Sequence, residues 1–340
     1  MFFPLSITVA KPQALSRFVQ AGNRMIVGLL LLALPVFLSG CGLISSGRLP
    51  QAMNTPPRAM VHEVPFYAQE EQQCGPAALA MALHWTGLAV QPADLAHEVF
   101  SPGLQGSLQS SLIGAARRHG RVAYPIAGSE SLLTEVSAGH PVIVLVNLGF
   151  FWYPKWHYAV VIGFDQDRGE VILHSGLNAN EHLSSTVFLN IWKRSEYWGL
   201  LILPPDRLPA GVEEEAWLTA VAGLEKAEQW QEAAVGYGAA QKRWKQSFGA
   251  WIGLGNSRYG LHDHAGAAKA FRKATLLQPE NGMAFNNLAH VLAEQGKRKE
   301  ALVAAQRAVD LGGPLLDTFR RTFEIIKTMP APQNGRKKSK

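Results

Sequence analysis

Hydrophobic residues along the chain follow a helical period first and a strand period later. From Ala77 onward, apolar residues recur every three to four positions, a spacing that is typical of helices. It predicts helices from Cys74 to near Gly87 and at 93–99, 106–118 and 131–138. After Gly139 the pattern changes to nearly continuous apolar runs rich in β-branched residues, which indicate buried strands.

These apolar runs predict strands at 141–147, 157–165, 170–174, 186–189 and 198–203. A short extended stretch at 64–67 precedes the first helix. Helices followed by short, closely spaced strands indicate an α+β domain whose sheet is mostly antiparallel. Three prolines between Pro204 and Pro209 then end the domain, because none of them continues a strand or a helix easily.

The C-terminal third repeats large and small apolar residues at a spacing of 34 positions. The aligned columns are Trp217, Trp251 and Phe285; Ala233, Ala267 and Ala301; Tyr237, Phe271 and Ala305; and Ala240, Ala274 and Ala308. This period and its large–small pattern resemble the tetratricopeptide repeat, so an all-α domain of paired helices is expected. Residues 315–329 are expected to form a capping helix that covers the last repeat.

The N-terminus carries an export pattern. Lys11, Arg17 and Arg24 precede an apolar run from Met25 to Leu38, which is too short to span a membrane comfortably. A basic region, a short apolar region and small residues before a cleavage point predict a secretory signal. Met25 is an alternative start, although it leaves Arg24 outside the basic region.

The segment Leu38-Ser39-Gly40-Cys41 resembles the bacterial lipoprotein box. The resemblance implies cleavage before Cys41 and a diacylglycerol on its thiol. Gly42 stands where lipoproteins kept at the inner membrane carry Asp, so the resemblance implies an outer-membrane anchor facing the periplasm.

These patterns divide the chain into six parts. They are a lipoprotein signal peptide at 1–40, a tether at 41–62, the α+β domain at 63–205, a linker at 206–212, the helical repeats at 213–329 and a basic tail at 330–340.

Charge and composition narrow the function further. The 340 residues are 47% hydrophobic, which is enough apolar material for two domains. Their formal net charge is +6. The basic residues are dispersed apart from the tail, so no nucleic-acid partner is expected. His262 and His264 stand alone, so no metal site is expected, and the sequence contains no motif that predicts a cofactor.

Cys74 is the candidate nucleophile. It lies where a helix begins, and Pro76 suits the first turn because its missing N–H has no partner there. Unpaired N–H groups and the positive end of the helix dipole favour the thiolate, which is the nucleophilic form. The chain has two cysteines. If Cys41 carries lipid, Cys74 has no disulfide partner in an oxidising compartment.

His157 is the candidate base. It opens the strongest predicted strand, directly after the aromatic loop 150–156. A histidine at a strand end can meet a helix N-terminus across a cleft, take the thiol proton and later protonate the leaving amine. The aromatic loop is expected either to shape a substrate groove or to pack over the sheet.

Three segments together resemble the bacteriocin-processing, double-glycine-leader cysteine peptidases and their stand-alone relatives. They are Gln69 with Cys74-Gly75-Pro76-Ala77-Ala78-Leu79-Ala80-Met81, then Gly139-His140-Pro141-Val142-Ile143, and His157-Tyr158-Ala159-Val160-Val161-Ile162-Gly163. The similarity covers about residues 60–205 and implies a papain-like fold. It carries over Cys74 as nucleophile, His157 as base and Gln69 as oxyanion donor, with Gln72 or Gln73 as alternative donors.

The third residue of the site departs from that family. The family has an Asp on the strand after the base, and His174 occupies the matching position here. A second imidazole accepts a hydrogen bond but brings no fixed charge, as in NlpC-type cell-wall peptidases. Asp165, Asp167 and Asn178 are the alternatives.

The resemblance implies a membrane-anchored cysteine peptidase that cleaves peptide bonds and whose repeats recruit a peptide or protein partner. Two alternatives stay open. The peptidase fold is a catalytically silent scaffold for the repeats, or the enzyme acts on cell-wall peptides.

Overall fold

The computed structural model describes residue 49, residues 55–69 and residues 72–330. The predicted signal peptide, Cys41, most of the predicted tether and the basic tail lie outside the described residues. Within the described ranges, every helix is too short or too polar to cross a bilayer.

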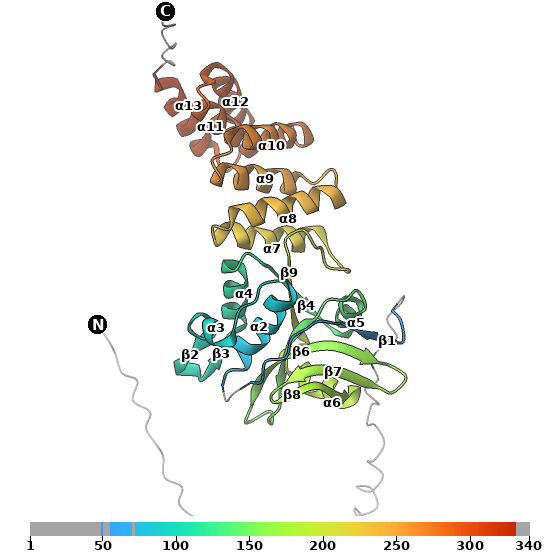
Figure 1. The fold of residues 1–340 in the computed structure, drawn as a ribbon. Coiled ribbons are helices and arrows are strands. Elements are labelled where there is room, and N and C mark those ends of the chain that lie inside the picture. The colour runs from blue at the N-terminus through green and yellow to red at the C-terminus, as the bar shows by residue number, and fades with distance from the viewer. Residues whose placement is uncertain (1–48, 50–54, 70–71, 331–340) are drawn as a thin grey trace, which may run out of the picture. The chain divides into compact units, whose positions relative to one another are not determined.

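The α+β domain contains five α-helices and nine strands among the described residues (Figure 1). The helices are α2 (Cys74–Trp85), α3 (Pro92–Val99), α4 (Gln109–Arg118), α5 (Ser129–Ser137) and α6 (Ser185–Trp192). The strands are β1 (Arg58–Met60), β2 (Phe100–Ser101), β3 (Gly106–Ser107), β4 (Val122–Ala127), β5 (Val142–Asn147), β6 (Trp156–Asp165), β7 (Glu170–Ser175), β8 (Asn178–Ser184) and β9 (Trp198–Leu203). Two 3₁₀ turns, η1 (Pro102–Leu104) and η2 (Lys193–Ser195), complete it.

The main sheet has the strand order β4-β9-β5-β6-β7-β8, with β1 added to β6. Each of these pairings is antiparallel, as the short spacing between the strands predicted. Because β1 pairs with the end of β6 near Asp165, the sheet already begins at Arg58, inside the stretch predicted as a tether.

Two hydrophobic layers cover the two faces of the sheet. Helix α2 is apolar all round, and its residues from Ala77 to Leu83 are buried against Tyr158, Val160 and Ile162 of β6. The intervening residues of β6 belong to a second core with Leu132 of α5 and other apolar residues. The alternation along β6 therefore positions the start of α2 beside the start of the strand.

The structure corrects three sequence predictions about elements. Residues 186–189 are helical rather than extended, because Phe188 and Trp192 are buried one helical turn apart in α6. Strand β4 was not predicted, since it contains Pro125, which is tolerated at a sheet edge. The polar strand β8 was also missed, and it forms the opposite edge.

The C-terminal region is all-α. Its helices are α7 (Glu214–Lys226), α8 (Trp230–Arg243), α9 (Phe248–Gly260), α10 (His264–Leu277), α11 (Gly282–Glu294), α12 (Arg298–Leu311) and α13 (Leu316–Thr328). The first helices of the pairs, α7, α9 and α11, begin 34 residues apart, and so do α8, α10 and α12. The predicted fold class, a papain-like α+β domain followed by an all-α domain, is confirmed.

The two regions share a hydrophobic core. Trp217 of α7 is fully buried in the same cluster as Val122 and Tyr124 of β4. The buried carboxylate of Glu135 accepts hydrogen bonds from the backbone N–H groups of Ala210 and Gly211. The connection between the regions is therefore hydrogen-bonded to the α+β domain at Ala210 and Gly211.

Candidate active site

Helix α2 begins at Cys74, so the predicted placement of the thiol at a helix N-terminus holds in the structure. Gln73 is the N-cap residue and makes no side-chain capping bond, which leaves N–H groups of the first turn open. Cys74 is partly exposed, so its sulfur is not sealed inside the domain.

The sulfur of Cys74 faces the backbone N–H of Tyr158, the peptide group that joins Tyr158 to His157. Burial raises the pKa of the Cys74 thiol above its ordinary value of 9.0, while the N–H groups of Tyr158, Gly75 and Cys74 itself oppose that rise. The helix N-terminus does act in the predicted direction. However, the loss of solvent outweighs it, so the resting group is a thiol rather than the predicted thiolate.

His157 is the second residue of β6, and Ser175 at the end of β7 holds it. The distance from Nε2 of His157 to Oγ of Ser175 is 3.1 Å. This bond commits Nε2 and leaves Nδ1 as the nitrogen that can receive a proton from a thiol. Among the described residues, the imidazole of His157 and the sulfur of Cys74 form no hydrogen bond with each other.

His157 is uncharged in the resting site. Burial lowers its pKa to about 4, and the positive charge of Lys155 contributes to the shift. Near neutral pH the site therefore holds a neutral thiol and a neutral imidazole, whereas the sequence predicted an ion pair. The physical reason is that burial disfavours both charged forms, and none of the described carboxylates is a cause of the shift at His157.

His174 does not orient His157 in this structure. Its Nε2 lies 3.2 Å from the carbonyl oxygen of Val64, and its Nδ1 accepts the backbone N–H of Asn180 at 3.1 Å. Both ring nitrogens are thus engaged in bonds that fasten the segment before α2 to β8. Its neighbour Ser175 makes the hydrogen bond that the sequence assigned to His174.

The other proposed partners of His157 also lie elsewhere. Oδ1 of Asp165 accepts the backbone N–H of Arg168, and Asp167 pairs with Arg58, both near the far end of β6. Asn178 is exposed on β8, directly across from Ser175. Ser175 was missed because the pairing of β6 with β7 shifts between Val161 and Gly163, and no local sequence pattern reveals such a shift.

Gln69 is buried beside the thiol. Its Nε2 donates to the carbonyl oxygen of Tyr158 at 3.3 Å, and its Oε1 accepts the backbone N–H of Gly176 at 3.1 Å. The side-chain amide is therefore fixed, with one of its two N–H groups uncommitted by these bonds. Gln72, one alternative donor, is exposed and has a left-handed backbone, whereas Gln73 occupies the N-cap position.

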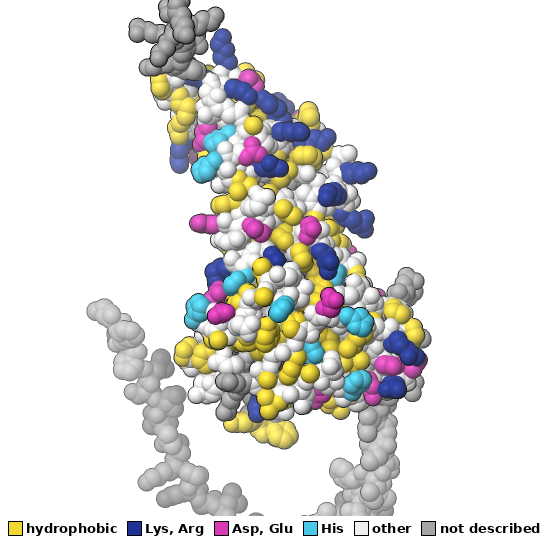
Figure 2. All heavy atoms as spheres, viewed as in Figure 1, with side chains coloured by type: hydrophobic (Ala, Val, Ile, Leu, Met, Phe, Trp, Pro, Cys, Tyr) yellow, Lys and Arg dark blue, Asp and Glu magenta, His cyan; other side chains and the backbone are white. Residues whose placement is uncertain are grey.

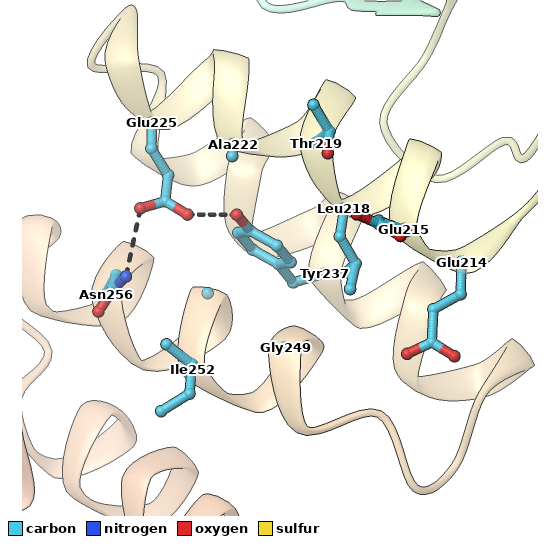
Figure 3. A pocket seen from close by; sticks show the side chains of 11 residues that line it. Glu214, Glu215, Leu218, Thr219, Ala222, Glu225, Tyr237, Gly249, Ile252 and Asn256 are labelled. Carbon is cyan, nitrogen blue, oxygen red and sulfur yellow. Dashed lines mark hydrogen bonds between the residues drawn. The ribbon is translucent and has the colours of Figure 1, made fainter. Parts of the chain in front are cut away.

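The described residues contain no group of histidine, cysteine and acidic side chains that fits a metal ion. A large cavity of about 640 Å³ lies away from Cys74, among α7, α8 and α9 (Figure 3). Tyr237 forms part of its wall and donates a hydrogen bond to Glu225, which also accepts one from Asn256. Glu214 and Glu215 line the same cavity, so its lining is acidic.

Three solved structures are similar to parts of this chain. Among curated proteins, none matches the chain. A structure described as a C39-like peptidase from Bacillus anthracis is 19% identical, with a TM-score of 0.37, and the match covers 43% of this chain and 97% of that one. The peptidase domain of Streptococcus ComA, a bi-functional ABC transporter of a quorum-sensing pathway, is 22% identical, with a TM-score of 0.36, over 42% of this chain and 99% of that one.

A third similar structure is the type III secretion chaperone SycD of Yersinia enterocolitica, in complex with a peptide of the translocator YopD. It is 16% identical, with a TM-score of 0.32, and the match covers 33% of this chain and 91% of that one.

A protein-family model described as the Peptidase_C39 like family matches residues 61–199. This range includes Gln69, Cys74, His157 and Ser175. Over residues 61–199, the α+β domain of this chain is therefore similar to the Peptidase_C39 like family.

Proposed function

We propose that this chain is a cysteine peptidase in which Cys74 attacks a peptide carbonyl and His157 transfers the proton. The observation that carries the proposal is that Cys74, at the start of α2, packs against the cluster that contains Tyr158, the neighbour of His157 in β6. The bond between His157 and Ser175 supports it, because an anchored imidazole presents its other nitrogen in a defined direction. The match of residues 61–199 to the Peptidase_C39 like family model supports it as well.

The neutral resting pair favours a mechanism in which proton transfer accompanies attack. Nδ1 of His157 accepts the thiol proton of Cys74 as the sulfur bonds to the scissile carbonyl carbon. The same proton passes to the leaving nitrogen when the C–N bond breaks, which leaves a thioester. Water then attacks the thioester with His157 as base, and the returning proton restores the thiol. Catalytic hydrogen bonds often tighten only when substrate binds, which fits the unbonded pair described above.

Two donors are available for the oxyanion that forms during attack. One is the backbone N–H of Cys74, at the open end of α2. The other is the uncommitted N–H of Gln69, whose side chain is fixed by Tyr158 and Gly176. Gln69 remains the preferred side-chain donor, because it is buried next to the thiol whereas Gln72 is exposed.

Labelling with an epoxide thiol probe tests the proposal. Cys74→Ala is expected to abolish labelling, and His157→Ala is expected to slow it strongly, because the proton acceptor is lost. His97→Ala is the matched control, since His97 is an exposed histidine on α3. If Cys74 reacts at the rate of an ordinary thiol and ignores the change at His157, the domain is a scaffold rather than an enzyme.

Substrate class is tested in the same assay. Peptides that carry a double-glycine leader and murein fragments are offered separately, and cleavage is followed by mass spectrometry. We propose leader-like or other polypeptide substrates. Cleavage of murein fragments alone would reassign the enzyme to cell-wall peptides.

We further propose that lipid on Cys41 anchors the protein to the periplasmic side of the outer membrane. The support is the Leu38-Ser39-Gly40-Cys41 segment, which follows a short apolar run. Metabolic labelling with an alkyne fatty acid is expected to tag the wild-type chain but not Cys41→Ala. Equal tagging of both proteins would contradict the anchor.

Finally, we propose that the helical region is a tetratricopeptide-type array that recruits a peptide partner through the cavity in Figure 3. The cavity lies between successive helices, and Glu214, Glu215 and Glu225 give it a negative lining, so a segment with Lys or Arg fits best. Binding of a fluorescent Lys-rich peptide is expected to weaken in Glu225→Gln. The control is Glu228→Gln, because Glu228 is exposed in the turn after α7.

A further inference from the structure

The connection between β5 and β6 exposes an unusual amount of aromatic surface. Residues 148–156, here called the aromatic hairpin, include Phe150, Phe151, Trp152 and Tyr153, which are 61%, 91%, 79% and 75% exposed. Leu148 and Trp156 are each about half exposed as well. Hydrophobic side chains project from the lower edge of the α+β domain in Figure 2, whereas charged and apolar groups are interspersed over the helical region. The expectation that this loop packs over the sheet is therefore wrong.

The aromatic hairpin is held in one conformation by backbone bonds. The buried side chain of Asn147 accepts the N–H groups of Gly149 and Lys155, each at 2.9 Å. Phe150 and Tyr153 bond to each other through their backbones, and the rings of Phe150 and Trp152 stack with centroids 5.0 Å apart. An ordered loop that keeps large apolar groups in water indicates a binding surface rather than a loose connection.

Gly149 is required for this conformation. A Cβ atom there would lie 2.3 Å from the carbonyl oxygen of Tyr153. Arg194 of η2 also donates hydrogen bonds to the carbonyl oxygens of Asn147 and Gly149. The guanidinium therefore lies at the base of the hairpin and reinforces it.

Charge around the aromatic hairpin favours an anionic surface. Lys155 is exposed within it, and Lys193 and Arg194 are exposed at its base. Residues 147–156 contain no Asp or Glu, and at the base of the hairpin the exposed Glu196 offsets one of the two cations. Aromatic side chains at a projecting tip with cations behind them match the boundary between headgroups and acyl chains of an anionic bilayer. A peptide, in contrast, is typically bound along a sheet edge or in a groove.

The chain outside the described residues makes a bilayer available. This step rests on the lipid at Cys41 in the proposed function. Leu49 is buried in the core of the α+β domain, so the seven residues at 42–48 set the distance from the lipid to the domain, up to about 25 Å when extended. A lipid on Cys41 would therefore keep the α+β domain close to the bilayer surface.

We propose that the aromatic hairpin inserts its tip into the interfacial region of an anionic phospholipid bilayer. Because the hairpin leads directly into His157, docking in this way turns the end of the sheet that carries His157 toward the membrane surface.

Quenching of tryptophan fluorescence by bromolipids tests the proposal. The full chain is reconstituted in vesicles of phosphatidylcholine and phosphatidylglycerol with brominated acyl chains. Quenching is expected, and Trp152→Phe is expected to lose most of it while the aromatic surface is retained. Trp244→Phe is the control, because Trp244 lies at the end of α8. Quenching that is absent, or equal in Trp152→Phe and wild type, would overturn the proposal.

Hydrogen exchange gives a second measurement that does not depend on Trp152. Amides at 148–156 are expected to exchange more slowly in vesicles, and Phe151→Ser is expected to remove that protection. Leu276→Ser is the matched control, since Leu276 is 76% exposed in the helical region. Protection by a peptide substrate but not by lipid would assign the hairpin to peptide binding and overturn the proposal. Epoxide labelling of Cys74 in the same vesicles reports separately on the peptidase function.

Discussion

Two neighbouring residues at the end of β7 have different roles. Ser175 binds His157, whereas His174 joins the carbonyl oxygen of Val64 to the N–H of Asn180. Successive side chains of a strand point to opposite faces, so adjacent positions in the sequence serve different surroundings. A hydroxyl holds an imidazole in place without fixing a negative charge beside it. Burial and the charge of Lys155 therefore keep the pKa of His157 low.

Substitution separates the two roles. Ser175→Ala is expected to slow epoxide labelling of Cys74 by about fivefold, because roughly one hydrogen bond is lost. Ser175→Thr is expected to restore the labelling rate, since threonine keeps the hydroxyl group. His174→Ala is expected to lower the melting temperature with a smaller effect on labelling, because its bonds fasten backbone segments. A large labelling defect in His174→Ala with a normal rate in Ser175→Ala would reverse this assignment.

The two shifted pKa values predict an unusual pH profile for thiol labelling. Between the pKa of His157, about 4, and the raised pKa of Cys74, proton transfer within the pair does not change its total charge. The labelling rate is therefore expected to fall below about pH 4, stay level through neutrality and rise only above pH 9. In His157→Ala the level region should be replaced by a steady decline as pH falls. Wild-type enzyme that shows this same decline would argue against His157 as the proton acceptor.

The lowered pKa of His157 also makes the stability of the folded protein depend on pH in the acid range. The pKa of His157 is lower in the folded protein than its ordinary value of 6.5. Between these values the unfolded chain binds more protons, so the free energy of unfolding falls as pH falls from 6.5 toward 4. His157→Gln is expected to reduce this loss, measured as a smaller change in melting temperature over that range. An unchanged pH dependence would show that other groups cause it.

At the scale of elements, the close approach of α2 and β3 sets the position of the thiol. A Cβ atom on Gly75 would lie 2.3 Å from Oγ and 2.5 Å from Cβ of Ser107. Gly75 is buried, and the Ser107 hydroxyl is buried without a hydrogen-bond partner in the described structure. The glycine after Cys74 is therefore needed for packing, independently of the chemistry.

Gly75→Ala is expected to cost about 1–3 kcal/mol of unfolding free energy, because the start of α2 must move away from β3. Labelling of Cys74 should fall with it, since the thiol moves as well. Gly103→Ala is the control, because nothing lies near the added methyl group there. Adding Ser107→Gly to Gly75→Ala is expected to recover part of the stability. No recovery would point to a cause other than this contact.

At the scale of the whole molecule, packed side chains join the α+β region to the helical region. Trp217 packs in one cluster with β4, and its indole N–H donates to the carbonyl oxygen of Gly236 in α8 at 3.1 Å. Arg117 of α4 lies so close to α7 that a Cβ atom on Gly223 would be 2.2 Å from its Nε. This contact links the α+β domain to the first helical pair, α7 and α8.

Trp217→Ala is expected to destabilise both regions by about 3–5 kcal/mol through loss of this shared core. Thermal unfolding followed by circular dichroism should show the sheet and the first helices melting together. Trp251→Ala, at the equivalent position of the next repeat, leaves the core shared with β4 intact. Two separate transitions in the wild-type protein would contradict a shared core.

Local sequence patterns determined the helix start at Cys74, the presence of a strand that contains His157 and the 34-residue spacing of the helical pairs. These features are local because periods of two and 3.6 residues, glycine and proline act within a few positions. Only the tertiary structure decided that Ser175 rather than His174 binds His157, because a register shift between distant strands chooses the side chain. It also decided that burial outweighs the helix dipole at Cys74, since the loss of solvent depends on everything that packs around the thiol.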